Sequence, residues 1–96
     1  MNVGVATIRV RLPENSSLKG KRSVIKSVVT QVRNRFNVAV AEVDDLDAWQ
    51  IATLGVSCIS NDRQHTNEVL SKVVGFIGNG RFDLEMLDYA IELLPV

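Results

Sequence analysis

The chain has 96 residues, of which 46% are hydrophobic and 5% aromatic, with 11 basic and 11 acidic residues. This length accommodates one domain, residues 1–96, and is too short for two domains with separate cores. Because aromatic residues are scarce, valine, isoleucine and leucine must supply most of the buried area. Cys58 is the only cysteine, which excludes a disulfide within the chain.

The zero net charge conceals a separation of charge along the sequence. Eight basic residues and one acidic residue precede Asn37, a net charge of +7, whereas three basic and ten acidic residues follow from Asn37 on, a net charge of −7. A neutral protein of this kind can still present a face that attracts polyanions. The separation is the strongest functional signal in the composition, and it concerns partners rather than chemistry.

Residues 2–12 alternate between two sets of side chains, the period of a β-strand. One set is Gly4, Ala6, Ile8, Val10 and Leu12, and the other is Val3, Val5, Thr7, Arg9 and Arg11. Pro13 ends the strand, and residues 14–17 supply a turn and an N-cap. Since arginines occur so early, the segment resembles neither a signal peptide nor a membrane span, and we expect a cytoplasmic protein with no membrane partner.

Residues 18–36 repeat apolar side chains at helical spacing and predict an amphipathic helix. The candidate RNA-binding residues lie on it: Lys19, Lys21, Arg22, Lys26 and Arg33. At about 100° per residue, all but Lys21 fall in one stripe, and Lys21 is placed beside it. Cations at a helix N-terminus oppose the helix dipole, so the stripe indicates a polyanion, structured RNA above all. The alternative is a solvated face paired with the chain's own acids.

Residues 38–43 and 48–59 predict two strands of a hairpin, joined by a turn at residues 44–47. The turn contains Asp44, Asp45 and Asp47, and Glu42 precedes it. Clustered carboxylates suit a hard cation, but no EF-hand pattern is present and aspartate is common in turns. We therefore predict no metal site.

A second helix is predicted after residues 60–62, with Gln64 completing a capping box if Asn61 is the cap, and it stops at residues 78–80. Its first turn holds His65, the only histidine, with Ser57, Cys58 and Ser60 shortly before it. Spacing alone does not assemble a nucleophile, a base and an orienting group from these residues. We predict no catalytic residues and no cofactor.

Residues 82–94 predict a last strand with a bulge, because the apolar residues change parity after Met86. The order βαββαβ predicts an α+β ferredoxin-like sandwich, a four-stranded antiparallel sheet with both helices on one face. The other face stays open and is expected to carry an oligomer interface of Val3, Val5, Trp49 and Ile51, with a homodimer as the simplest assembly. Trp49 and Tyr89 could instead stack bases, but the RNA-recognition signature is absent.

Several strings together resemble the YlxP-like family of small bacterial proteins of unknown function. They are Ser17 to Arg22, Arg33 to Val38, Ala41 to Val43, Trp49-Gln50, Leu54 to Val56, Ser60 to Asp62, and His65. The resemblance covers essentially the whole chain and implies a ferredoxin-like fold. It also implies a gene that often neighbours those of translation initiation factor two and ribosome-binding factor A. Gly20 departs from the family, which often has an acid or amide there, and Ile51 stands where a polar residue is frequent.

The sequence thus supports a non-enzymatic cytoplasmic protein that contacts ribosomal or other structured RNA through its first helix. A homo-oligomeric interaction module without nucleic-acid binding is the alternative. An enzyme built around His65 and the acidic hairpin comes third.

Overall fold

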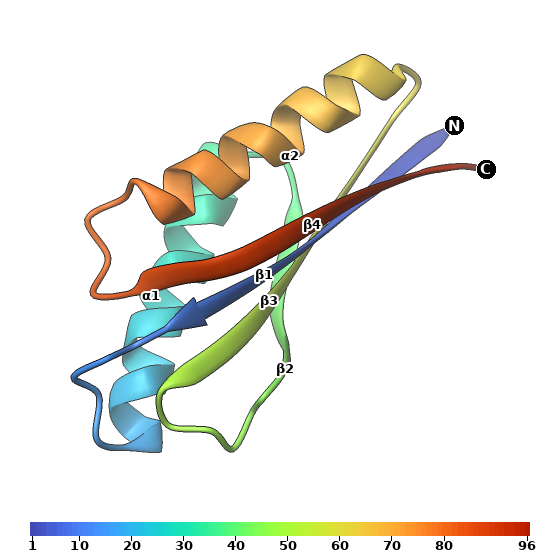
Figure 1. Ribbon diagram of the computed structural model, residues 1–96. Helices are drawn as coiled ribbons and strands as arrows, with labels where there is room; N and C mark the ends of the chain where they lie inside the picture. The colour runs from blue at the N-terminus through green and yellow to red at the C-terminus, as the bar shows by residue number, and fades with distance from the viewer.

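The structure, a computed structural model, describes residues 1–96. Its elements are β1 (Asn2–Arg11), α1 (Leu18–Arg35), β2 (Ala39–Asp44), β3 (Ile51–Ser60), α2 (Arg63–Gly78) and β4 (Glu85–Pro95). The strands form one sheet in the order β2-β3-β1-β4, with every neighbouring pair antiparallel. Both helices lie on the same face of this sheet (Figure 1). The predicted ferredoxin-like α+β sandwich is confirmed.

The core lies between the helices and one face of the sheet. The alternation in β1 sorts its side chains as predicted, because Ala6, Ile8 and Val10 are fully buried whereas Thr7, Arg9 and Arg11 are exposed. The strands β3 and β2 add Ala52, Leu54, Val56 and Val40, and the helices add Ile25, Val28, Val32, Leu70, Val73, Val74 and Ile77. The second face of the sheet is left without a covering layer.

Three element boundaries differ from the sequence prediction or refine it. β3 begins at Ile51 rather than at residue 48, because residues 45–50 form a loop. Asp62 is the N-cap of α2, where its carboxylate accepts hydrogen bonds from the backbone N–H groups of Gln64 and His65. β4 begins at Glu85 and contains the predicted bulge, since Arg9 pairs with Asp88 and Val10 with Met86, which leaves Leu87 as the extra residue.

Gly4 tests how closely α2 packs on the sheet. A Cβ at this position would overlap side-chain atoms of Thr66 and Leu70, whereas a Cβ at Gly75, within α2, would meet no atom within 4 Å. We expect Gly4→Ala to lower the free energy of unfolding by about 1–3 kcal/mol through overpacking. Gly75→Ala should raise it by about 0.5–1 kcal/mol, because alanine is the better helix former. Urea denaturation measures both, and a neutral Gly4→Ala would contradict the close packing.

Candidate nucleic-acid interface

The start of α1 is fixed by side chains from two loops. Ser17 caps the helix, and its Oγ accepts a hydrogen bond of 3.0 Å from the backbone N–H of Gly20. The Asn15 amide donates to the carbonyls of Ser17 and Trp49, and Gln50 donates to the carbonyl of Asn15. A Cβ at Gly20 would overlap the Asn15 amide oxygen. Glycine at this position therefore makes room for the contacts that join the start of α1 to the loop before β3.

Lys21 is completely buried beneath the start of α1. Its Nζ donates to the carbonyls of Asp45 at 2.7 Å, Ile51 at 3.0 Å and Leu46 at 3.4 Å. The Oε2 atom of Glu42 lies 2.8 Å from the same nitrogen. The three carbonyls accept the N–H groups of the ammonium, and Glu42 balances its charge as an ion pair.

The structure removes Lys21 from the predicted RNA-binding set. Its ammonium has no exposed surface and its donors are in use, so a phosphate cannot reach it. The periodicity of the sequence contains the signal: Lys21 precedes Ile25 by four residues and Val28 by seven, which places it on the core-facing side of the helix. The number of charges alone does not distinguish a core-facing lysine from an exposed one.

The other four predicted cations, Lys19, Arg22, Lys26 and Arg33, are exposed along α1. None of them lies within 4.0 Å of a carboxylate, because the two ion pairs of the protein are Lys21–Glu42 and Arg9–Asp88. The first turn of the helix contains no acid. Arg33 alone is anchored, through a hydrogen bond of 3.1 Å from its guanidinium to the carbonyl of Val40. The alternative of a helix face paired with the chain's own acids therefore gains no support.

The acidic hairpin is used for local structure. Asp45 adopts a positive φ of 58°, which aspartate tolerates in turns, and its Oδ2 accepts a hydrogen bond of 2.7 Å from Thr53. Asp44 accepts from the backbone N–H of Asp45, and Glu42 faces Lys21. No group of three or more His, Cys, Asp or Glu side chains is arranged to hold a metal ion.

Comparison with known proteins identifies the family. Residues 3–91 match the family described as "Protein of unknown function (DUF503)". The chain belongs to the DUF503 family. A relative, "Uncharacterized protein YlxP" of Bacillus subtilis (strain 168), is 36% identical over 75 residues, which is 78% of this chain and 82% of the relative. The resemblance seen in the sequence is confirmed. Neither helix is long and apolar enough to cross a membrane.

The residues near the single histidine of this DUF503 protein take part in local contacts. His65 is exposed in the first turn of α2, and its backbone N–H donates to Asp62. The Ser60 hydroxyl bonds the backbone of Asp62. The Cys58 thiol lies 4.0 Å from the carbonyl of Thr66, and burial raises its pKa. A thiol with a raised pKa stays protonated at neutral pH and is a weaker nucleophile.

The four predicted interface residues do not form one patch. Val3 and Val5 lie at one end of the open face, whereas Ile51 pairs with Arg11 at the other end. Eight residues of strand separate the two ends, about 25 Å. Trp49 lies in the loop before β3 and is 55% exposed. The parity of the strands predicted a face for these residues, but only the antiparallel register gives their positions along it.

The register instead gathers other apolar residues around Val3. Ile59 of β3 and Leu94 of β4 are its direct partners on either side, and Ile59 is 68% exposed. We call Val3, Val5, Ile59 and Leu94 the apolar end of the sheet. Next to it lies a shallow hollow of about 430 Å³, lined mainly by small and apolar residues of β2 and β3. The sequence offered one signal for Ile59, namely that an antiparallel third strand ends where the first begins.

Lys21 and Glu42 should act as a unit in stability. Lys21→Met leaves the largely buried carboxylate of Glu42 without a cation and three carbonyls without a donor, and should cost about 3 kcal/mol of unfolding free energy. Lys21→Met with Glu42→Leu should recover part of that loss. The matched control, Lys26→Met on the exposed side of α1, should stay within about 0.5 kcal/mol of the wild type. Denaturant titration followed by circular dichroism measures all three, and equal costs at the two lysines would contradict the structural role of Lys21.

Proposed function

We propose that this protein is a non-catalytic, cytoplasmic RNA-binding protein that contacts the phosphates of structured RNA with the exposed side of α1. The observation that supports the proposal is the set of four exposed cations without a carboxylate partner: Lys19, Arg22, Lys26 and Arg33. A helix rise of 1.5 Å per residue spreads these four over about 21 Å. That length suits contacts with several phosphates of one duplex.

The proposed contacts read the backbone of the RNA rather than its bases. In RNA-recognition domains of this topology, aromatic side chains of the sheet stack the bases. Here Trp49 lies outside the strands, and Tyr89 pairs with Ile8 on the helix-facing parity of β4. The centre of the open face carries Thr7, Arg9 and Gly55 instead. Sequence preference should therefore be slight, because phosphate contacts carry no direct sequence information.

RNA binding should depend on salt and on the position of the charges. We expect the logarithm of the affinity for a labelled RNA hairpin to fall with the logarithm of potassium chloride concentration, with a slope magnitude of about 3 for four phosphate contacts. Lys19→Glu/Arg22→Glu/Lys26→Glu should weaken binding at least tenfold and flatten this slope, since each contact contributes about 0.7–0.9 to it. Fluorescence anisotropy measures the affinity, and circular dichroism confirms folding.

The matched control is Arg63→Glu/Lys72→Glu/Arg81→Glu, which changes the net charge equally at three exposed residues outside α1. This variant should keep most of the affinity. If both triple variants lose affinity equally, the effect is one of net charge, and the exposed side of α1 is only a solvated surface. Equal affinity and slope in the wild type and the α1 variant would have the same meaning.

A second candidate function, self-association, is favoured by the apolar end of the sheet. Ile59 is mostly exposed although it is large and apolar, it pairs with Val3, and Val5 lines the hollow beside β2. Contiguous apolar surface of this kind marks interaction sites, and a two-fold dimer is the simplest closed assembly.

The apolar end can be tested separately from the first proposal. Wild-type protein at micromolar concentration should scatter light as a dimer, and Ile59→Glu should scatter as a monomer, because it places a charge in the shared apolar surface. Trp49→Glu, which changes an exposed residue outside β3, should leave the dimer intact. A monomeric wild type would exclude self-association in this concentration range.

A further inference from the structure

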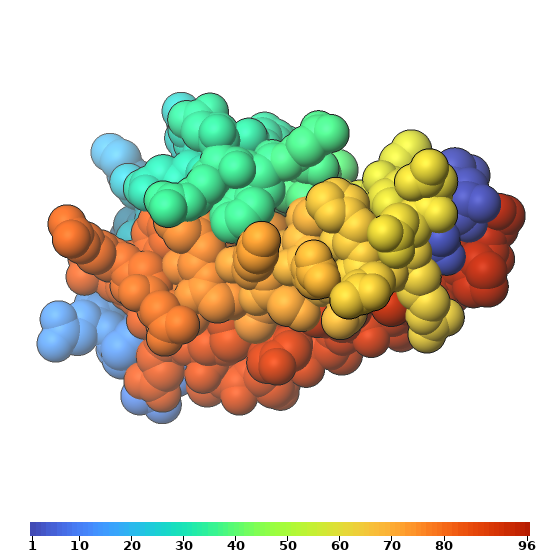
Figure 2. Space-filling view, turned by 90° about the horizontal axis from the view of Figure 1, so that it is seen from above, coloured from blue at the N-terminus to red at the C-terminus, as the bar shows by residue number.

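β4 is an edge strand whose outer side has no neighbour. It is the last strand in the sheet order and bonds only to β1 over its eleven residues. Figure 2 shows its red atoms along one side of the molecule, beside the orange and gold atoms of α2. An unpaired edge of this length is a template for another strand unless the protein blocks it.

The terminal hydrogen bonds show which β4 groups face outward. Met1 and Val96 bond each other through both their backbone groups, at 3.0 Å and 2.8 Å. Hydrogen-bonded and non-hydrogen-bonded pairs alternate in an antiparallel ladder. The β4 residues that pair with Val3, Val5 and Thr7 therefore direct their backbone N–H and C=O groups toward β1. The backbone N–H and C=O groups of Tyr89, Ile91 and Leu93 therefore point away from the sheet.

The opposite edge of the sheet, formed by β2, is protected against an added strand, whereas β4 is not. β2 has only six residues, its register with β3 shifts after Glu42, and the Arg33 guanidinium occupies the carbonyl of Val40. Short length, irregular pairing and an inserted charge are common protections of edge strands. β4 has two comparable protections, the bulge at Leu87 and the ring of Pro95, and they lie at the two ends of its unpaired outer edge. Residues 89–93 stay open between them.

The charge along this edge is entirely negative. Residues 82–96 contain Asp83, Glu85, Asp88 and Glu92 and no basic residue. Asp88 and Glu92 lie on the open face with Ala90 between them. Their backbone groups are hydrogen-bonded to β1, so with an added strand they would form non-hydrogen-bonded pairs. Side chains approach most closely in such pairs. Arg9 lies 3.4 Å from Asp88, whereas Glu92 has no cation partner.

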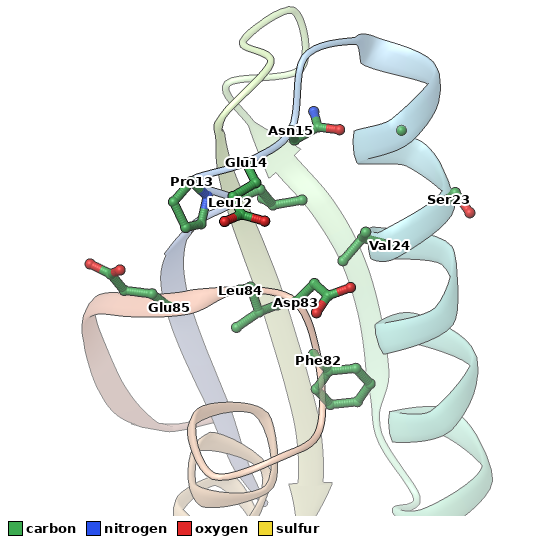
Figure 3. A pocket seen from close by; sticks show the side chains of 11 residues that line it. Leu12, Pro13, Glu14, Asn15, Ser23, Val24, Phe82, Asp83, Leu84 and Glu85 are labelled. Carbon is green, nitrogen blue, oxygen red and sulfur yellow. The ribbon is translucent and has the colours of Figure 1, made fainter.

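A cavity of about 610 Å³ extends the acidic edge beyond the start of β4. Figure 3 shows the carboxylates of Glu14, Asp83 and Glu85 among its lining residues, together with the apolar side chains of Leu12 and Leu84. A cationic side chain with an apolar stem has suitable surroundings there.

We propose that β4 accepts a fifth strand from an extended basic segment of another protein. The segment carries two cationic side chains four residues apart, opposite Asp88 and Glu92, and apolar side chains on the alternate face, beside Tyr89 and Ile91. A second copy of this chain fits less well, because pairing two β4 edges gathers the carboxylates of both copies on one sheet. The surface is separate from the cations of α1, so the inference does not rest on the proposed RNA contact.

The test uses a blocked, labelled peptide, Thr-Lys-Val-Thr-Val-Lys-Thr, and two variants of one residue. Tyr89→Ala and Tyr89→Pro both lose the ring, but only proline also loses the outward N–H. We expect Tyr89→Pro to bind the peptide roughly tenfold more weakly than Tyr89→Ala, the effect of about one hydrogen bond. Glu92→Gln should also weaken binding, and the peptide with glutamate in place of both lysines should not bind.

Amide hydrogen exchange of the wild type tests the same edge without any substitution in β4. The N–H groups of Tyr89, Ile91 and Leu93 should gain protection when the peptide is added. Absence of this protection, equal binding by the two Tyr89 variants, or equal binding of the lysine and glutamate peptides would each overturn the proposal. Protection that appears without peptide as protein concentration rises would assign the edge to self-association and would overturn it as well.

Discussion

A single buried ammonium group holds together the end of the molecule where α1, the loop of residues 45–50 and the start of β3 meet. Burying an ion costs several kcal/mol even after relaxation, and the cost at Lys21 is offset by three carbonyls and the carboxylate of Glu42. These partners come from β2, from the loop and from β3. Together with the core side chains Ile25, Val28 and Val32, this residue fixes the position of α1 over the sheet and the direction in which its exposed cations point.

Local patterns predicted the elements, whereas long-range pairing was needed for the sites. The alternation in β1 predicted its core face, and the change of parity in β4 predicted its bulge. Both signals come from neighbouring residues of one strand. Ile51 and Val3 share a face, as parity predicted, yet lie at opposite ends of it because of the register. Lys21 was grouped with its exposed neighbours because its charge was read without its spacing from Ile25. The open edge of β4 appears only once the strand order is known.

The separation of charge along the sequence is kept in space only in part, because Glu42 pairs with Lys21 of α1 and Asp88 of β4 pairs with Arg9. α1 contacts β2 at one side of the sheet, and the acidic strand β4 forms the opposite edge. The exposed cations of α1 and the carboxylates of β4 therefore lie on different parts of the surface. The two proposed contacts, with structured RNA and with a basic polypeptide, therefore use different surfaces.

The hydrogen bond from Arg33 to Val40 gives the four exposed cations unequal roles. A guanidinium carries five N–H donors, so Arg33 can retain its bond to the strand and still offer donors to a phosphate. Its side chain has already lost much of its rotamer freedom on folding, whereas Lys19, Arg22 and Lys26 would lose theirs on binding, about 0.5–1.5 kcal/mol each. Arg33 is thus the one member of the group whose guanidinium is already positioned by the fold.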